Sequence, residues 1–193
     1  MQVDVIDVFD FDGTIIKANS FREITKKTLL LLLKKFRFNP LCVLAGVLIL
    51  RKTGVLSYND FKTRAISIFE GKLTREEKSN ICKSVFDENI NAGVLERLIA
   101  SKCGVISTAS PYAYISRMSF GKDITIISAF DPRGLLPDAA NLGEGKVKNL
   151  IAYFGSDKIR VANFYTDSFE DQPMIDFAEN AFMCSGGQIR KIK

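Results

Sequence analysis

The feature that most constrains this chain is an acidic motif at the end of an apolar segment. Residues 3–9 are mostly β-branched or apolar and predict a buried strand. The motif Asp-Phe-Asp-Gly-Thr follows at residues 10–14 and places Asp10 and Asp12 at the strand's carboxyl end, the edge where open α/β folds bind ligands. Two close carboxylates repel each other and lose hydration, which favours a cation between them. The alternative is a solvated acidic turn, because Asp-Gly is a common turn dipeptide.

Composition limits the chemistry that this chain can perform. Its 193 residues, 47% of them hydrophobic, suit one globular domain or a core with a modest insertion. Histidine is absent, which excludes Ser-His-Asp and Cys-His mechanisms and every metal site built on histidine. Any catalysis must therefore use carboxylates, lysine, hydroxyl groups and a hard cation.

Charge and cysteine usage indicate the partners and the compartment. The net charge of +5 suits an anionic substrate, while no Lys/Arg tract is dense enough to predict nucleic-acid binding. The cysteines are scattered, without a Cys-x-x-Cys pair, and no secretory signal opens the sequence. This pattern predicts reduced thiols in a cytoplasmic protein. The cysteines are Cys42, Cys82, Cys103 and Cys184.

The block that follows the motif, residues 19–91, is expected to be helical, since it contains no convincing strand. Ser20 and Glu23 have the spacing of a capping box for a helix over residues 20–36. Asn39-Pro40 is expected to end that helix. The other helices of this block are expected over residues 41–50, 56–69 and 73–86.

An apolar hairpin is predicted inside this helical block. Residues 29–33 and 41–50 are strongly apolar, but each is too short to span a bilayer, which takes about 20 residues. The simpler interpretation is a packed helical hairpin. The alternative is an apolar surface that contacts a membrane or a lipid-like substrate. We expect a mixed outcome, in which most of residues 29–33 are buried and part of residues 41–50 lines or rims the substrate entrance. The flanking basic residues are Lys34, Lys35, Arg37, Arg51 and Lys52.

Beyond the helical block, predicted strands alternate with predicted helices. This alternation predicts an α/β protein with a Rossmann-like, doubly wound parallel sheet. We expect residues 1–18 and 92–193 to form the core, with residues 19–91 as an all-helical cap inserted between its first two strands. The later strands are expected over residues 104–108, 124–128, 161–165 and 181–184. The later helices are expected over residues 94–100, from Pro111, and over 145–154 and 172–179.

Three further stretches carry polar groups at strand ends or helix starts. Residues 106–111 offer hydroxyl and N–H groups for an anion, although Ser110 could simply cap a helix. Lys146 opens a helix, where the helix dipole does not favour a cation, although a surface lysine is the commoner explanation. Asp167 and Asp171 follow an apolar strand, and a helix cap accounts for one of these acids more easily than for both.

In this order, the four motifs resemble those of the haloacid dehalogenase superfamily of phosphotransferases, over residues 3–187. The helical insertion is similar to that of the subgroup with phosphoserine phosphatases, in which the insertion is a cap over the active site. The resemblance implies that Asp10 is the nucleophile that becomes an aspartyl-phosphate and that Asp12 is the general acid and base. It also implies that Thr108 and the Ala109 N–H hold the phosphoryl oxygens, while Lys146 offsets their charge.

The same resemblance implies a Mg²⁺ site. Its ligands would be the carboxylates of Asp10 and Asp167 and the backbone carbonyl of Asp12, with Asp171 orienting them through hydrogen bonds. Oxygen ligands with retained waters suit Mg²⁺. The cation and a lysine would together stabilise a phosphoryl group during its transfer.

Two positions bear on the substrate. Asn19 stands where phosphoserine phosphatases carry a substrate-contacting glutamate, and Arg64 is the approximate counterpart of a substrate-binding cap arginine. We therefore expect a phosphorylated small molecule that is larger or more apolar than phosphoserine, in the extreme a lipid-like one.

Together these features predict a Mg²⁺-dependent phosphomonoester hydrolase that acts through a phosphoenzyme on Asp10. One alternative is a phosphotransferase that uses an acceptor other than water. Another is a membrane-associated or partner-binding module that keeps the fold without turnover. The intact set of predicted catalytic residues argues against the binding module, because such a module needs no general acid beside a nucleophile.

Overall fold

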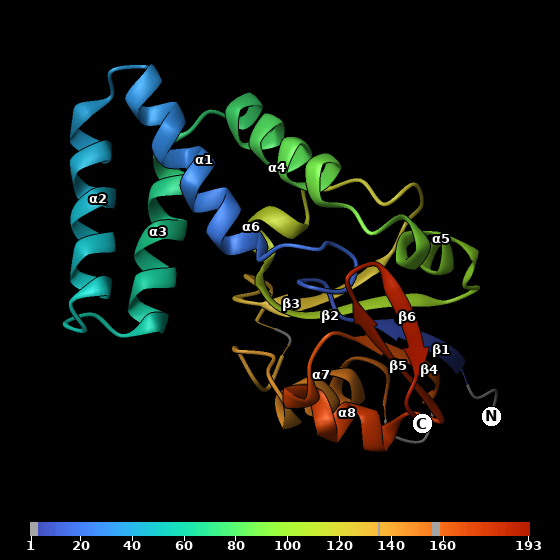
Figure 1. Ribbon diagram of the computed structural model, residues 1–193. Coiled ribbons are helices and arrows are strands. Elements are labelled where there is room, and N and C mark those ends of the chain that lie inside the picture. Colours follow the sequence, from blue (N-terminus) through green and yellow to red (C-terminus); the bar gives the residue numbers. More distant parts are fainter. Residues whose placement is uncertain (1–3, 135, 156–158) are drawn as a thin grey trace.

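A six-stranded sheet forms the centre of the computed structural model, which describes residues 4–134, 136–155 and 159–193 (Figure 1). The strand order is β3-β2-β1-β4-β5-β6, and every neighbouring pair is parallel except the antiparallel pair β5–β6. The strands are β1 (Asp4–Phe9), β2 (Gly104–Pro111), β3 (Thr125–Ala129), β4 (Ile159–Thr166), β5 (Asn180–Ser185) and β6 (Gln188–Lys191). The predicted α/β fold with a parallel sheet is confirmed, although the predicted start of the first strand, at residue 3, lies outside the described residues.

Both faces of this sheet are buried, and successive side chains of the central strands point to opposite faces. Ile6 and Val8 of β1 belong to one apolar cluster, whereas Phe9 of the same strand belongs to the other, as the two-residue period of a strand requires. Helices α5 and α6 cover the Phe9 face, and α7 and α8 cover the opposite face (Figure 1). Their bounds are α5 (Ala92–Ala100), α6 (Tyr112–Ile115), α7 (Glu144–Phe154) and α8 (Gln172–Phe177).

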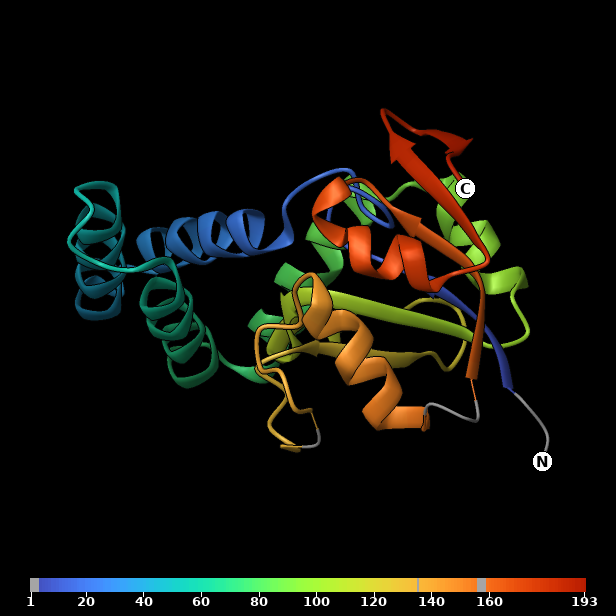
Figure 2. The same ribbon diagram turned by 90° about the horizontal axis from the view of Figure 1, so that it is seen from below.

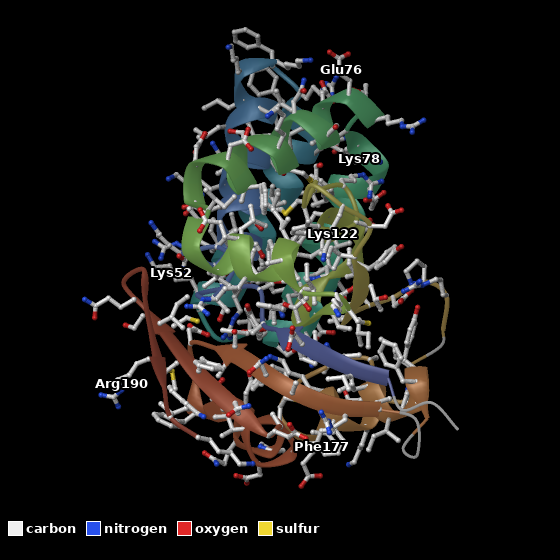
Figure 3. The ribbon with its side chains drawn as sticks, turned by 90° about the vertical axis from the view of Figure 1, so that its right-hand side faces the viewer. Lys52, Glu76, Lys78, Lys122, Phe177 and Arg190 are labelled. Carbon is white, nitrogen blue, oxygen red and sulfur yellow. The ribbon has the colours of Figure 1, made fainter. Side chains whose placement is uncertain are left out.

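Four longer helices lie between β1 and β2 in the sequence, as expected, and α1–α3 extend away from the sheet (Figures 1 and 2). The chain leaves and re-enters the core at one place, where Ile16 and Ile90 form an antiparallel bridge. In Figure 3, Glu76 and Lys78 of α4 lie at the opposite end of the molecule from Phe177 of α8. These helices are α1 (Ser20–Lys34), α2 (Phe38–Lys52), α3 (Tyr58–Lys72) and α4 (Arg75–Asn89).

Two predictions about the ends of α1 are wrong. Its N-cap is Asn19, whose side chain accepts a hydrogen bond from the Arg22 N–H, because the Ser20 hydroxyl is used elsewhere. The helix ends at Lys34, and Phe36 adopts a left-handed conformation before α2 begins. Pro40 therefore does not end α1 but lies in the first turn of α2, where its missing N–H costs no helical hydrogen bond.

The prediction that most of residues 29–33 are buried is also wrong. Only Leu32 of this run is fully buried, whereas Leu30 and Leu33 are each 53% exposed. A helix turns by about 100° per residue, so consecutive leucines point in different directions: Leu29 and Leu31 are partly buried against the core, and only Leu32 is fully buried. In the part of the chain that the structure describes, no helix combines the length and apolar character needed to cross a membrane.

Strand β6 was not predicted. It pairs with β5 through a tight hairpin at Gly186 and Gly187, both of which have positive φ. A Gly-Gly pair between two extended segments is typical of a hairpin, so this pair could have predicted β6 from the sequence.

Substitution of two neighbouring leucines tests the packing of α1. Leu32→Ala should lower the free energy of unfolding by about 3 kcal/mol, because it leaves a cavity in the core. Leu33→Ala, one residue further along the same helix, should change it by less than about 1 kcal/mol. Urea unfolding followed by circular dichroism measures both, and equal losses would contradict the burial of Leu32.

Candidate active site

The carboxyl ends of β1, β2 and β4 meet at one cavity of about 400 Å³. Asp10 directly follows β1, and its N–H donates to the Tyr165 carbonyl of β4 at 2.8 Å. Asp167 directly follows β4, so the parallel strands bring both acids to the same edge of the sheet. The expected site residues that line the cavity are Asp10, Asp12, Thr108, Ala109, Lys146, Asp167 and Asp171.

Strand β2 contributes an irregular segment to this cavity. Thr108 pairs with Ser128 of β3 and Pro111 pairs with Ala129, so Ala109 and Ser110 lie outside the regular ladder. Such bulges occur next to active sites because they redirect side chains and backbone groups. Strand β2 runs on through Pro111, and Ser110 therefore does not cap a helix.

A buried ion pair network surrounds Lys146. Its Nζ donates to Asp10 Oδ1 at 2.9 Å and to Asp171 Oδ2 at 2.7 Å, and only 2% of Lys146 is exposed. Thr166 Oγ1 donates to the same Asp171 oxygen at 2.8 Å. Although burial alone would lower the pKa of Lys146, the two carboxylates raise it above its ordinary value. Burial raises the pKa of Asp10 to about 7, against the opposing effect of Lys146.

Asp12 is held by a network of hydroxyl groups. Its Oδ1 accepts the Ser20 backbone N–H at 2.8 Å, and its Oδ2 accepts the Ser110 hydroxyl at 2.7 Å. The Ser110 hydroxyl also lies 2.9 Å from the Ser20 hydroxyl and 3.1 Å from that of Tyr114. Burial raises the pKa of Asp12, while hydrogen bonds from Ser20 and Ser110 oppose that shift. No local pattern predicts this network, because Ser110 lies 98 residues from Asp12 in the chain.

The oxygen atoms near Asp167 fit a hard cation. Gly13 has φ +72°, and a Cβ at this position would lie 1.9 Å from Asp167 Oδ2, so only glycine lets this carboxylate approach the loop. Burial raises the pKa of Asp167, which means that its ionised form lacks full solvation. Among the described residues, no three acidic, histidine or cysteine side chains alone form a metal cluster. Two carboxylates, a carbonyl and retained waters suit Mg²⁺, which does not need to take all of its ligands from the protein.

Arg64 does not reach the cavity. It is exposed on α3, whereas Lys62, two residues earlier, is buried and lines the cavity. A helix turns by about 100° per residue, so residues two positions apart point to nearly opposite sides. This explains why Lys62 lines the cavity and Arg64 does not. Lys62 Nζ donates to the Ala109 carbonyl at 3.3 Å and lies 4.8 Å from the centre of the Tyr58 ring. Burial lowers the pKa of Lys62, while Asp12 partly offsets that shift.

The cavity has other lining residues, of which the sequence pointed only to Ser110, within the predicted anion-binding stretch, and to Asn19, as a position that bears on the substrate. Several of them come from the helical block and lie opposite the sheet edge. This set consists of Asn19, Phe21, Tyr58, Lys62, Ser110, Leu142, Ser168 and Glu170.

Comparison with known proteins identifies the family model that fits this arrangement. The model of the haloacid dehalogenase-like hydrolases matches residues 8–176, and no curated protein matches the chain. Among solved structures, a protein with unknown function from Bordetella pertussis Tohama I is similar, with a TM-score of 0.64, 15% identity and coverage of 93% of this chain and 89% of that chain. A HAD family hydrolase from Salmonella enterica serovar Typhi has a TM-score of 0.52 and 17% identity, over 92% of this chain and 61% of that one. At such low identities, these structural matches show the fold alone.

Removal of the buried lysine tests the ion pair network without reference to activity. Lys146→Met should lower the free energy of unfolding by about 3–5 kcal/mol at pH 8 in EDTA, because Asp10 and Asp171 are left as buried charges. The loss should be smaller at pH 5. The folded variant then keeps protons that the unfolded chain releases as the pH rises, so its stability falls between pH 5 and pH 8.

The matched control is Lys148→Met on the same helix, where the lysine side chain is 64% exposed. It should cost less than about 1 kcal/mol at either pH. A loss for Lys146→Met that is as small as the control's, or that does not depend on pH, would contradict the network.

Proposed function

Because the chain belongs to the haloacid dehalogenase-like hydrolases, we propose that it is a Mg²⁺-dependent phosphomonoester hydrolase that works through an aspartyl-phosphate on Asp10. The observation that carries this proposal is the pairing of two differently held carboxylates in one cavity. Asp10 is bonded to a buried lysine, whereas Asp12 is bonded only to hydroxyl and N–H groups. Such a difference in surroundings separates a nucleophile from a general acid.

In the first step, an Asp10 carboxylate oxygen attacks phosphorus, and the bond from phosphorus to the leaving oxygen breaks. Lys146 favours the ionised form of Asp10 that this attack requires. The protonated Asp12 donates its proton to the leaving oxygen, and its burial raises its pKa in the direction that an acid needs. The products of this step are an alcohol and the phosphorylated Asp10.

In the second step, the ionised Asp12 accepts a proton from a water molecule, whose oxygen attacks the phosphorus and releases phosphate from Asp10. Ser110 supports both states of Asp12, because a hydroxyl group can donate or accept a hydrogen bond. It donates to Asp12 Oδ2 in this structure, as an ionised carboxylate requires, and by rotating it can accept from the protonated form. The nearby Ser20 hydroxyl can then accept the Ser110 proton.

The remaining residues position the phosphoryl group. Thr108 and the irregular strand segment at Ala109 present hydroxyl and N–H groups at the cavity. Mg²⁺ would be held by the carboxylates of Asp10 and Asp167 and the Asp12 carbonyl, with Asp171 oriented by Thr166 and Lys146. When bound, it supplies positive charge that offsets the charge of the transferring phosphoryl group.

The helical block then acts as a cap. We propose that residues 19–91 cover the catalytic cavity, while residues 1–18 and 92–193 form the catalytic core. In support, Phe21 of α1 and Tyr58 of α3 line the cavity from the side of the helical block. The bridge between Ile16 and Ile90 joins the two parts at the base of the block.

Replacement of the nucleophile tests the mechanism. Asp10→Asn is isosteric and should lower the hydrolysis of para-nitrophenyl phosphate by several orders of magnitude. The control is Asp7→Asn in the same strand, where the carboxylate accepts hydrogen bonds from Ser101 and Asn163 outside the cavity. This control should keep its turnover, whatever stability it loses. Residual activity of Asp10→Asn above about one hundredth of the wild type would disprove the covalent role.

The same assay separates hydrolysis from transfer. Nitrophenol and inorganic phosphate should appear in equal amounts, because water is the proposed acceptor. Nitrophenol without phosphate, together with a phosphorylated added alcohol, would instead identify a phosphotransferase. Neither product, from a folded protein with Mg²⁺, would favour a binding module.

Removal of the metal tests the cofactor. Activity should disappear in EDTA and return with Mg²⁺, while Ca²⁺ should support it poorly because its larger, more flexible ligand shell misplaces the nucleophile. Mg²⁺ should also raise the melting temperature of the wild type, because a ligand that binds only the folded state stabilises it. Asp167→Asn should lose that rise, whereas the exposed Asp176→Asn should keep it. Turnover that is unchanged by chelation would contradict the metal assignment.

A further inference from the structure

A second cavity, of about 570 Å³, lies among helices α1, α2 and α3 and adjoins the catalytic cavity. The two cavities share three lining residues, Asn19, Phe21 and Tyr58. A molecule that is bound at Asp10 can therefore continue past this shared wall into the helical block. The second cavity is called the α1–α3 groove below.

The floor of the α1–α3 groove is apolar and partly aromatic. Phe21 packs edge-on against Phe61, with ring centres 5.3 Å apart, and against Tyr58 at 6.3 Å. Leu29 of α1 and Leu48 of α2 line its outer part, and both are partly buried. Its volume lies within the range of sites for small molecules, which are mostly apolar with a few polar groups.

Two cations flank this apolar floor. Arg22 and Lys26 line the groove from successive turns of α1, and both are exposed. At the inner end, Lys62 faces the catalytic cavity above the Tyr58 ring. From Asp10 outwards, the lining therefore changes from an anion site to the aromatic residues shared by both cavities, and then to an apolar groove with a basic rim. This order suits an amphipathic anion.

We propose that the substrate is a phosphomonoester of an alcohol with an apolar chain of roughly six or more carbons, and that this chain binds in the α1–α3 groove. The inference rests on the proposed phosphatase activity, and it adds the substrate class. The shared wall argues for a substrate chain rather than a separate partner, because three residues that line the groove also line the cavity of the reacting groups. The basic rim attracts the phosphate as it enters.

The test compares butyl phosphate with decyl phosphate, each at a concentration where it is monomeric by light scattering, with Mg²⁺ present. Burial of a methylene is worth about 0.8 kcal/mol, or up to about fourfold in kcat/KM. Since the groove is open on one side, the six additional methylenes of decyl phosphate should raise kcat/KM by at least about 30-fold.

Two adjacent positions of α2 provide a matched pair of variants. Leu48→Glu places a charge in the groove and should reduce the decyl-to-butyl ratio to below about threefold. Ile49→Glu introduces the same charge on the same helix, where the side chain is 62% exposed and does not line the groove, and should keep the ratio of the wild type. Leu29→Gln is the second groove variant, and it takes the place of Leu48→Glu if that protein does not fold by circular dichroism.

The outcomes separate the two proposals. A wild type that hydrolyses neither alkyl ester nor para-nitrophenyl phosphate would contradict the phosphatase activity itself, whereas hydrolysis of para-nitrophenyl phosphate alone would overturn the substrate class. Equal kcat/KM for both esters would leave the activity intact and overturn the groove as a chain site. If Leu48→Glu then also converted a dimer to a monomer by light scattering, the groove would be an interface between copies of this chain. A high ratio that persists in the folded groove variants would place the chain on another surface and likewise overturn the inference.

Discussion

The contact on which the site depends is the buried ammonium group of Lys146 between Asp10 and Asp171. It joins residues that are 136 positions apart in the chain, and thereby connects the end of β1, the first turn of α7 and the segment after β4. The N-terminus of a helix disfavours a cation, so this lysine is stable there because two carboxylates surround it. Removing the lysine leaves two buried carboxylates without a counter-charge, whereas removing either carboxylate leaves one ion pair. The positive charge of Lys146 also partly neutralises Asp10 in a cavity that an anionic phosphoryl group must enter.

The arrangement of the sheet explains how a long helical insertion can coexist with this sensitive centre. Strands β1 and β2 remain hydrogen-bonded neighbours although five helices, α1 to α5, lie between them in the sequence. The chain leaves and returns next to the bridge of Ile16 with Ile90, so the helical block is connected to the core at its base. Its inner residues, Phe21, Tyr58 and Lys62, line the cavity without bearing on the ion pair network. In the proposed function, the core supplies the chemistry and the helices supply the selection of the substrate.

The sequence predicted those parts of the molecule that follow from local rules. The parallel sheet followed from the alternation of apolar strands with helices. The joint site of Asp10, Thr108, Lys146 and Asp167 was implied by the resemblance to the haloacid dehalogenase superfamily, which rests on the order of the four motifs. Predictions failed where the position of a side chain depends on residues far away in the sequence. Ser20 has the spacing of a helix cap, yet its hydroxyl bonds with Ser110, which no local pattern reveals. Arg64 was expected as the approximate counterpart of a cap arginine, but the sequence does not show which side of α3 faces the cavity, and Lys62 lines it instead.

The most direct test of this account is to trap the phosphoenzyme. Brief incubation of the wild type with Mg²⁺ and a phosphomonoester, followed by borohydride, reduces an acyl phosphate to an alcohol at the side chain that carried it. Peptide mass spectrometry then locates the change. The account predicts reduction at Asp10 alone, and only when both the substrate and Mg²⁺ are present. Reduction at Asp12, Asp167 or Asp171, or turnover with no reducible residue under conditions that trap a known aspartyl-phosphate, would contradict it.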